Sequence, residues 1–316
     1  MGASQIIPTL DSTIRVSSNI SVGYNRATHE FSCAEENPLL CEVAQNNGLE
    51  IPDLEERKQF VQSNWMQTMN YALNSTTQLR LQVPVVFQSV QYTYTKLADG
   101  ASYTPPTDYP SLFHPEHTYV GLGDAQLALQ RFVFLPKVVI GTEIGTRLPT
   151  GSTKFSEYSL EDFHQPVTTG TVVPLFSLML FTRGTNDGWV GNVQSQLPVY
   201  ANSDAYRTGK FVSLDAGYWK KVATDYRVLG QVRSSYETGD TWHEVDIPTS
   251  NRMFVYTGVM LTKTLSNKQI ADKQSEMMLR VDIPVYGKIF SMPSSSTHMS
   301  INTLYKPTLS IGMTWL

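Results

Sequence analysis

One stretch of the chain alternates between two kinds of side chain for eleven residues. In VVIGTEIGTRL, residues 138–148, valine, isoleucine, threonine and leucine occupy the even positions, and two glycines, a glutamate and an arginine occupy odd ones. Successive side chains of a β-strand point to opposite faces of a sheet, so the pattern predicts a strand with one apolar and one polar face. A soluble sheet turns its apolar face to a packed core, whereas an outer-membrane barrel turns that face to lipid. One strand fits both a soluble sheet and an outer-membrane barrel, so the distinction must come from the rest of the sequence.

The composition favours a membrane-facing chain. Charged residues make up 16% of the 316 residues, well under the roughly 25% of soluble proteins. Mean hydropathy is nevertheless slightly negative at -0.21, and no run of about eighteen apolar residues occurs, which excludes transmembrane helices. A net charge of -4 without any lysine- and arginine-rich run disfavours nucleic acid as a partner.

Twelve segments show the same period-two alternation, and the connections between them are long and short in turn for most of the chain. Many exceed the 5 or 6 residues at which globular strands centre and match a tilted membrane crossing of about 9 to 11 residues. The predicted strands are residues 14–24, 65–73, 78–95, 123–134, 138–148, 171–182, 189–200, 210–219, 226–237, 254–264, 276–286 and 304–315.

These features predict an all-β fold, a transmembrane antiparallel up-and-down β-barrel of about twelve strands with short periplasmic turns and long extracellular loops. Residues 13–316 form this single barrel domain, and residues 1–12 form a periplasmic segment or a plug. Residues 25–62 form a long extracellular loop that contains a short helix in DLEERKQFVQ, residues 53–62.

Two local features of the predicted barrel can be checked directly. In residues 78–95 the apolar parity changes near Gln88 and Ser89, which predicts a β-bulge, and Pro84 marks a further irregularity because it lacks a ladder N–H. Tyrosine and tryptophan gather near strand ends, as the aromatic girdles of a barrel do. The predicted girdle residues are Trp65, Tyr92, Tyr94, Trp189, Tyr200, Trp219, Tyr236, Tyr286, Tyr305 and Trp315.

Three pieces of sequence resemble a known family. VGLGDAQLALQRFV (residues 120–133), the strand that ends RLPTGS (residues 147–152), and LRLQVPVVFQSVQY with its mid-strand proline (residues 79–92) are similar to outer-membrane channels of the "MetA-pathway of phenol degradation" or transporter type. The resemblance implies a monomer-sized barrel for uptake of small, often aromatic or hydrophobic molecules. The chain departs from that pattern in its long first loop with two cysteines and in the final Leu316.

The parity argument places nine charged side chains on the lumen side of the strands. They either form a constriction that selects solutes by charge or pair into a static network that stabilises the barrel, and the sequence leaves both interpretations open. These candidates are Arg80, Asp124, Glu143, Arg147, Asp215, Arg227, Arg233, Arg280 and Asp282.

Other chemistry-bearing residues predict less. Cys33 and Cys41 are the only cysteines and are candidates for a loop disulfide of an exported protein. His114 and His117 flank a proline in a predicted loop and indicate no metal site. We expect no catalytic residues and no cofactor, because no nucleophile elbow, His-Glu-x-x-His motif or phosphate-binding glycine loop occurs.

The sequence thus predicts a channel for passive uptake of small solutes, aromatic or hydrophobic ones among them, in the outer membrane of a Gram-negative bacterium. The expected partners are outer-membrane lipid and small solutes, with no nucleic acid. The alternative is a closed structural or docking barrel that binds a protein partner, or forms a homo-oligomer, through its long surface loops. A soluble all-β protein is a third possibility.

Overall fold

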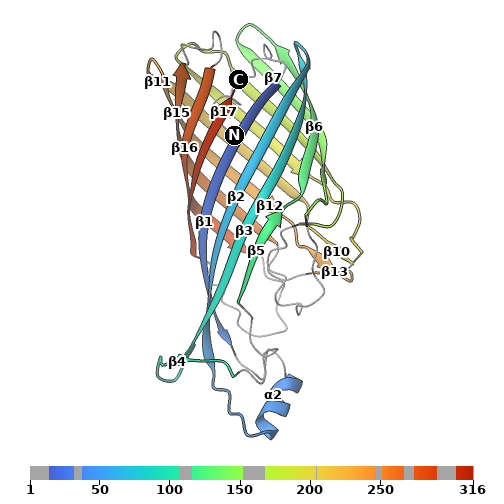
Figure 1. Cartoon of the computed structure of the whole chain (residues 1–316), viewed down its shortest axis with the longest axis vertical. Coiled ribbons are helices and arrows are strands. Elements are labelled where there is room, and N and C mark those ends of the chain that lie inside the picture. The colour runs from blue at the N-terminus through green and yellow to red at the C-terminus, as the bar shows by residue number, and fades with distance from the viewer. Residues whose placement is uncertain are drawn as a thin grey trace.

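Twelve long strands form a closed antiparallel barrel in the computed structural model (Figure 1). The structure describes residues 14–31, 38–106, 116–151, 168–203, 205–246, 251–266, 274–289 and 304–315. The barrel strands are β1 (Ile14–Phe31), β2 (Leu54–Asn74), β3 (Thr77–Lys96), β6 (Ala125–Phe134), β7 (Val138–Leu148), β8 (Val173–Thr182), β9 (Asp187–Gln196), β11 (Phe211–Ala223), β12 (Tyr226–Glu237), β15 (Arg252–Ser266), β16 (Gln274–Ile289) and β17 (Leu304–Trp315).

Each long strand pairs with the one before it and the one after it in this series, as an up-and-down barrel requires. The barrel closes where the first strand meets the last, with Val16 opposite Trp315 and Ile20 opposite Ile311. The predicted fold class is therefore confirmed, and all twelve predicted strands are present.

The apolar face of the strands points outward. On β8, Leu178 and Leu180 are 44% and 46% exposed, whereas the alternating residues Ser177 and Met179 are 3% and 5% exposed. A soluble barrel would not leave such side chains in water around its whole circumference, and a lipid bilayer covers them. In the stretch that opened the sequence analysis, Ile144 is 68% exposed and Glu143 is 2% exposed. The even positions of residues 138–148 therefore face lipid.

The glycines of that stretch make room inside the barrel. A Cβ on Gly145 would lie 2.4 Å from the Leu127 carbonyl oxygen and 2.5 Å from Ala128 Cβ, and a Cβ on Gly141 would lie 2.8 Å from the Phe132 ring. Both glycines sit on the inward parity, where the wall curves and side chains crowd. Glycine is needed at these positions because neighbouring strand atoms already fill the space.

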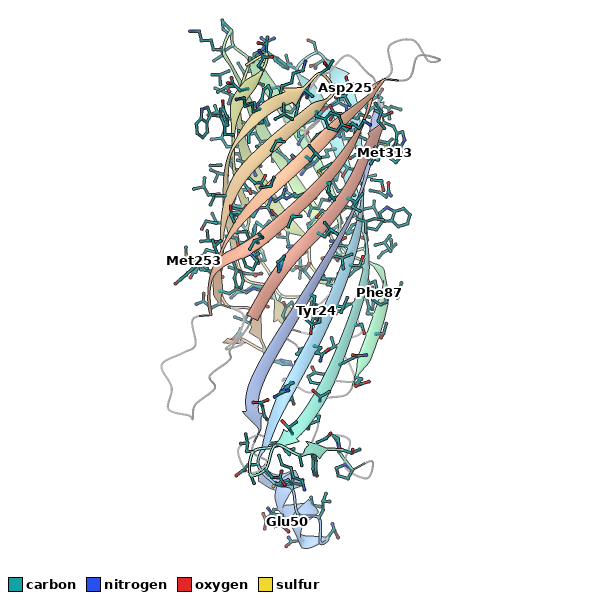
Figure 2. The ribbon with its side chains drawn as sticks, turned by 90° about the vertical axis from the view of Figure 1, so that its left-hand side faces the viewer. Tyr24, Glu50, Phe87, Asp225, Met253 and Met313 are labelled. Carbon is teal, nitrogen blue, oxygen red and sulfur yellow. The ribbon has the colours of Figure 1, made fainter. Side chains whose placement is uncertain are left out.

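The two ends of the barrel differ. At the turn end, β2 and β3, β6 and β7, β8 and β9, and β11 and β12 are joined by short connections, one of them the turn at Asp225 (Figure 2). At the opposite loop end, the connections are longer and carry β10 (Tyr206–Arg207), β13 (Thr241–Trp242) and β14 (Val245–Asp246), which form a small separate sheet. Short turns at one end and long loops at the other match the prediction.

Strands β1, β2 and β3 run past the loop end and form an extension (Figures 1 and 2). It carries β4 (Ser102–Tyr103), β5 (His117–Leu122) and helix α2 (Pro38–Asn46). The predicted loop 25–62 is therefore wrong at both ends, and the helix predicted in residues 53–62 is strand. Continuous pairing of β2 with both β1 and β3, from Leu54 onward, overrides the helical appearance of that polar segment.

The change of parity in β3 is not a bulge. Its register with β2 is continuous across Gln88 and Ser89, so the predicted bulge is wrong. Within the barrel the apolar side chains of β3 point outward, but in the extension Val90, Tyr92 and Tyr94 point inward and pack with α2 residues. The pattern inverts because the extension has an apolar core of its own. The inversion marks the end of the lipid-facing part of the strand.

Pro84 does mark an irregularity. The partner of β3 changes there, from β6 up to Gln82 to β5 from Val85. The Pro84 carbonyl accepts a hydrogen bond from Gly123 N at 2.9 Å, between these two partners. Proline fits at this position because the ladder is already interrupted.

The aromatic girdle is confirmed only in part. Trp65, Trp189, Tyr200, Tyr236, Tyr286 and Trp315 are 41–60% exposed. Tyr92 and Tyr94 lie instead in the core of the extension, and Trp219 is 4% exposed inside the barrel, so these three were wrongly predicted. The side chain of Tyr305 lies outside the described residues. Among the described residues, no helix is long and apolar enough to cross a membrane.

Candidate functional site in the barrel lumen

A cavity of about 260 Å³ lies in the lumen. Its lining comes from opposite walls of the barrel, with Ser17 and Asn19 on β1, Arg80 on β3, and Ser213 on β11. Methionine and phenylalanine side chains line it together with amides, hydroxyls and charged groups. The site is therefore amphipathic, and the surrounding networks decide which of its charges a solute meets.

The first network joins β3, β6 and β7. Arg80 Nη2 donates to Glu143 Oε1 at 2.5 Å, and the side chain of Glu143 is only 2% exposed. Gln130 donates to the other carboxylate oxygen and accepts from Gln78 Nε2 at 2.5 Å. The two predicted charges thus neutralise each other within a hydrogen-bonded chain.

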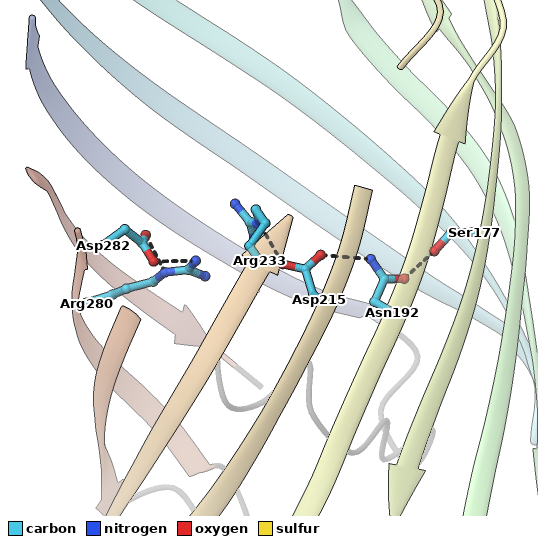
Figure 3. Close-up of polar contacts among 6 residues, drawn as sticks. All are labelled: Ser177, Asn192, Asp215, Arg233, Arg280 and Asp282. Carbon is cyan, nitrogen blue, oxygen red and sulfur yellow. Dashed lines mark hydrogen bonds and ion pairs between the residues drawn. The ribbon is translucent and has the colours of Figure 1, made fainter. Parts of the chain in front are cut away.

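The second network crosses four neighbouring strands (Figure 3). Ser177 Oγ donates to Asn192 Oδ1 at 2.6 Å, Asn192 Nδ2 donates to Asp215 Oδ2 at 3.5 Å, and Arg233 Nε donates to Asp215 Oδ1 at 2.5 Å. Because each side chain is fixed by the next, the network holds the Arg233 guanidinium on the lumen side of β12.

Two further ion pairs use predicted lumen charges. Arg280 binds Asp282 through both Nε and Nη2, at 2.6 and 2.8 Å, so this bidentate pair uses both groups on one edge of the guanidinium (Figure 3). Arg227 lies 3.7 Å from Glu276 and stands over the Trp219 ring at 5.9 Å from its centroid.

The remaining two candidates bind neutral partners near the loop end. Arg147 donates to the Gln196 amide oxygen. Asp124 is 5% exposed and accepts from the Thr168 hydroxyl and, at 2.8 Å each, from Thr169 N and its hydroxyl. Asp124 therefore fixes the chain at residues 168–171 and does not belong to the central lumen. Each of the nine predicted side chains has a partner, and a role in selectivity stays a prediction.

A buried pair of a tyrosine and an aspartate lies outside the membrane-spanning strands. Tyr206 donates from its hydroxyl to Asp240 Oδ2 at 2.9 Å, and Gly209 N donates to Asp240 Oδ1 at 2.6 Å. Burial raises the pKa of the Asp240 carboxyl above its ordinary value. Burial, together with the nearby Asp240 charge, also raises the pKa of Tyr206. The pair ties the two longer connections that hold β10 and β13.

An apolar surface lines the lumen near the turn end, and we call it the apolar crescent. Its residues point inward from seven strands between β6 and β16, and Val190 of β9 packs against them. The wall formed by β17, β1, β2 and β3 carries Thr314, Thr68 and Gln78 instead. The apolar crescent consists of Phe132, Val139, Met179, Phe181, Trp219, Leu229, Met260 and Met278.

Sequence reasoning missed several of these residues. Glu276, Glu237 and Arg252 occupy inward parity positions, and Arg252 Nη2 binds Glu237 Oε2 at 2.7 Å. Glu276 and Glu237 stand at the ends of the predicted strands 276–286 and 226–237, on the parity of the predicted lumen charges, so the parity rule itself includes them. Arg252 lies two residues before the predicted strand 254–264 and was missed because that strand begins at Arg252 in the structure. The apolar crescent gave no separate signal, because most strands contribute a single member and on β8 both faces are apolar, with Met179 and Phe181 inward and Leu178 and Leu180 outward.

Only one cysteine of the predicted disulfide, Cys41, lies among the described residues. Cys41 is 3% exposed in α2, packs with Ala44 and Leu54, and is not a free thiol. Cys33 lies outside the described residues, so the Cys33 to Cys41 disulfide stays a prediction. The predicted plug in residues 1–12 and His114 also lie outside the described residues. Among the described residues no group of three or more His, Cys, Asp or Glu side chains is placed to hold a metal ion.

The closed barrel, its outward apolar band and its lumen networks define an outer-membrane type of β-barrel. No family model matches the chain, and no curated protein matches its sequence. Membership of the "MetA-pathway" type therefore stays a prediction.

Several solved structures are similar to the chain at very low sequence identity. An outer membrane channel from Pseudomonas putida F1 is similar at a TM-score of 0.51 and 10% identity, over 95% of this chain and 94% of that one. A Pseudomonas aeruginosa FadL homologue has a TM-score of 0.45 at 8% identity, over 100% and 94% of the two chains. The P. putida toluene transporter TodX has a TM-score of 0.42 at 7% identity, over 100% and 93%.

Proposed function

We propose that the chain is an outer-membrane channel for passive uptake of small solutes with an apolar or aromatic body. The observation that carries this proposal is the two-sided lumen, in which an apolar crescent faces a polar wall and shares Met278 with an amphipathic cavity. Such a lining suits molecules that have both an apolar surface and a polar group.

The charges of the lumen support the same proposal. Arg80 with Glu143, Arg233 with Asp215, and Arg280 with Asp282 form ion pairs, so these positions create little net potential for attracting free ions. The apolar crescent adds a barrier for hydrated ions, because it offers them no hydrogen bonds in exchange for water. A solute with an apolar body gives up fewer hydrogen bonds to water when it passes the apolar crescent.

The fold and its surroundings agree with this assignment. The similar structure from P. putida F1 is described as an outer membrane channel, which supports a channel role for the same architecture. The outward apolar band and exposed aromatic residues suit the outer membrane of a Gram-negative bacterium, with its lipid as the partner of the barrel wall. The turn end then faces the periplasm and the loop end the exterior.

A second candidate function rests on the extension. Strands β1 to β3 and helix α2 form a small body with its own apolar core beyond the barrel, which a simple pore does not need. In this alternative the barrel is closed, and the extension binds a protein partner or another copy of the chain at the cell surface.

Solute flux separates the two functions. The refolded chain is placed in liposomes, and swelling is compared in isosmotic phenylalanine and in glucose, a polar solute of similar size. The channel proposal predicts faster swelling in phenylalanine, because its ring can contact the apolar crescent. Equal rates would indicate a simple sieve, and absence of swelling in both, from protein with heat-shifted gel mobility, would favour the docking barrel.

A further inference from the structure

Two arginines in the lumen are held in different ways. Arg280 uses Nε and Nη2 to bind Asp282, and its side chain is 6% exposed. Arg233 binds Asp215 through Nε, and its side chain is 36% exposed. Its two terminal NH2 groups have no partner among the described residues, so they are available to a molecule in the lumen.

The surroundings keep Arg233 in place while leaving those groups accessible. Asp215 receives Arg233 on one oxygen and Asn192 on the other, and Asn192 is held by Ser177 (Figure 3). A guanidinium whose torsions are fixed in this way loses less entropy when it binds a ligand. Its planar shape matches a carboxylate, which can accept two parallel N–H bonds.

Arg233 and Asp215 both line the cavity of about 260 Å³. Phe211, Met66 and Met278 line the same cavity and provide apolar contacts. Two arginines, Arg80 and Arg233, and two acids, Asp215 and Glu276, are part of the lining, so its formal charges balance. An anion bound there is held by local geometry and not by a strong overall potential, which suits a solute that must also leave.

We propose that this cavity is a binding site for small monocarboxylates with an apolar body, and that the Arg233 terminal NH2 groups hold the carboxylate. The apolar body lies against the phenylalanine and methionine side chains of the lining. This assignment rests on the proposed channel function for its role in uptake, whereas the binding site itself is testable without transport.

Calorimetric titration of the refolded full chain in detergent micelles tests the site. The probes are sodium benzoate and benzyl alcohol, which share a ring and differ in the carboxylate. Losing charge-assisted hydrogen bonds should weaken benzoate binding about tenfold in Arg233→Gln and less in Arg233→Lys, which keeps the charge but not the fork. Benzyl alcohol should bind all variants alike. The matched control is Arg131→Gln, the same change on an exposed residue of β6.

The outcomes are distinct. Unchanged benzoate affinity in Arg233→Gln, equal weakening of benzyl alcohol, or no benzoate binding by the parent chain would overturn the proposal. Heat-shifted gel mobility checks each fold, and Arg233→Lys provides the comparison if Arg233→Gln does not refold. Phenylalanine flux without Arg233-dependent benzoate binding would support the channel function and refute the binding site. Arg233-dependent benzoate binding without phenylalanine flux would support the binding site and refute the channel function.

Discussion

Replacing Glu143 by glutamine tests whether lumen charges stabilise the barrel. The change keeps the side-chain shape but leaves Arg80 as a buried cation without its carboxylate, and Arg80 and Glu143 are 14% and 2% exposed. Breaking a buried ion pair by removing one partner costs about 3–5 kcal/mol of unfolding free energy. We expect Glu143→Gln to fall in that range, because Gln130 can compensate only part of the lost interaction.

The chain supplies a matched control. Arg57 Nε lies 2.5 Å from Glu55 Oε1, the same separation as in the lumen pair, but these side chains are 40% and 35% exposed. Glu55→Gln should therefore cost about 0–1 kcal/mol, because water solvates the remaining arginine. The double variant Arg80→Gln with Glu143→Gln should lose less stability than Glu143→Gln alone, since no buried charge is left unpaired.

Equilibrium urea unfolding in lipid vesicles measures all four proteins, with heat-shifted gel mobility as the readout of the folded barrel. The reasoning is refuted if Glu143→Gln and Glu55→Gln cost the same, or if the double variant loses as much stability as Glu143→Gln alone or more. Either result would mean that water reaches Arg80 and screens it as it does on the surface.

Three further predictions follow from the described contacts. Gly145→Ala should prevent normal barrel formation, because its Cβ would overlap backbone atoms of β6, whereas Gly230→Ala, with nothing within 4 Å of the new Cβ, should refold normally in a gel-mobility assay. Asp124→Ala should expose residues 168–171 to hydrogen exchange and cost about 2–3 kcal/mol, since it removes a buried acceptor of three hydrogen bonds. Burial raises the pKa of Asp240, so as pH rises above about 4 this carboxyl ionises in the unfolded chain before it ionises in the folded chain. The parent chain should therefore lose stability relative to Asp240→Asn with rising pH, until the raised pKa of the folded chain is passed. Urea unfolding from pH 4 to pH 8 checks this, and a constant difference would contradict it.

The barrel was predictable from sequence because period-two alternation is a local signal that every lipid-facing strand must carry. Residues 138–148 show this clearly, since Ile144 and Glu143 are adjacent in sequence and opposite in exposure. The same signal misled where the environment changed. In β3 the apolar parity inverts at Val90 because the extension packs on its inner face, and no local rule distinguishes that from a bulge.

The lumen was predictable as a list of residues but not as an arrangement. Parity placed Arg233 and Asp215 on the lumen side, yet only the register of β11 with β12 shows that they stand opposite each other. Arg280 and Asp282, two residues apart on β16, share a face by parity alone. Trp219 looked like a girdle residue because it lies near a strand end, but its parity is inward. Pairing between distant strands therefore holds the information that sequence alone lacked.

The central claim is that solutes cross through the lumen cavity, and blocking the cavity tests it most directly. Ser213 is 4% exposed and lines the cavity, while the adjacent Leu214 is 54% exposed on the outer face. Phenylalanine-driven swelling is measured in liposomes that contain equal amounts of folded Ser213→Trp or Leu214→Trp protein. We predict that Ser213→Trp abolishes swelling and Leu214→Trp retains it. Equal swelling in both would contradict a path through this lumen.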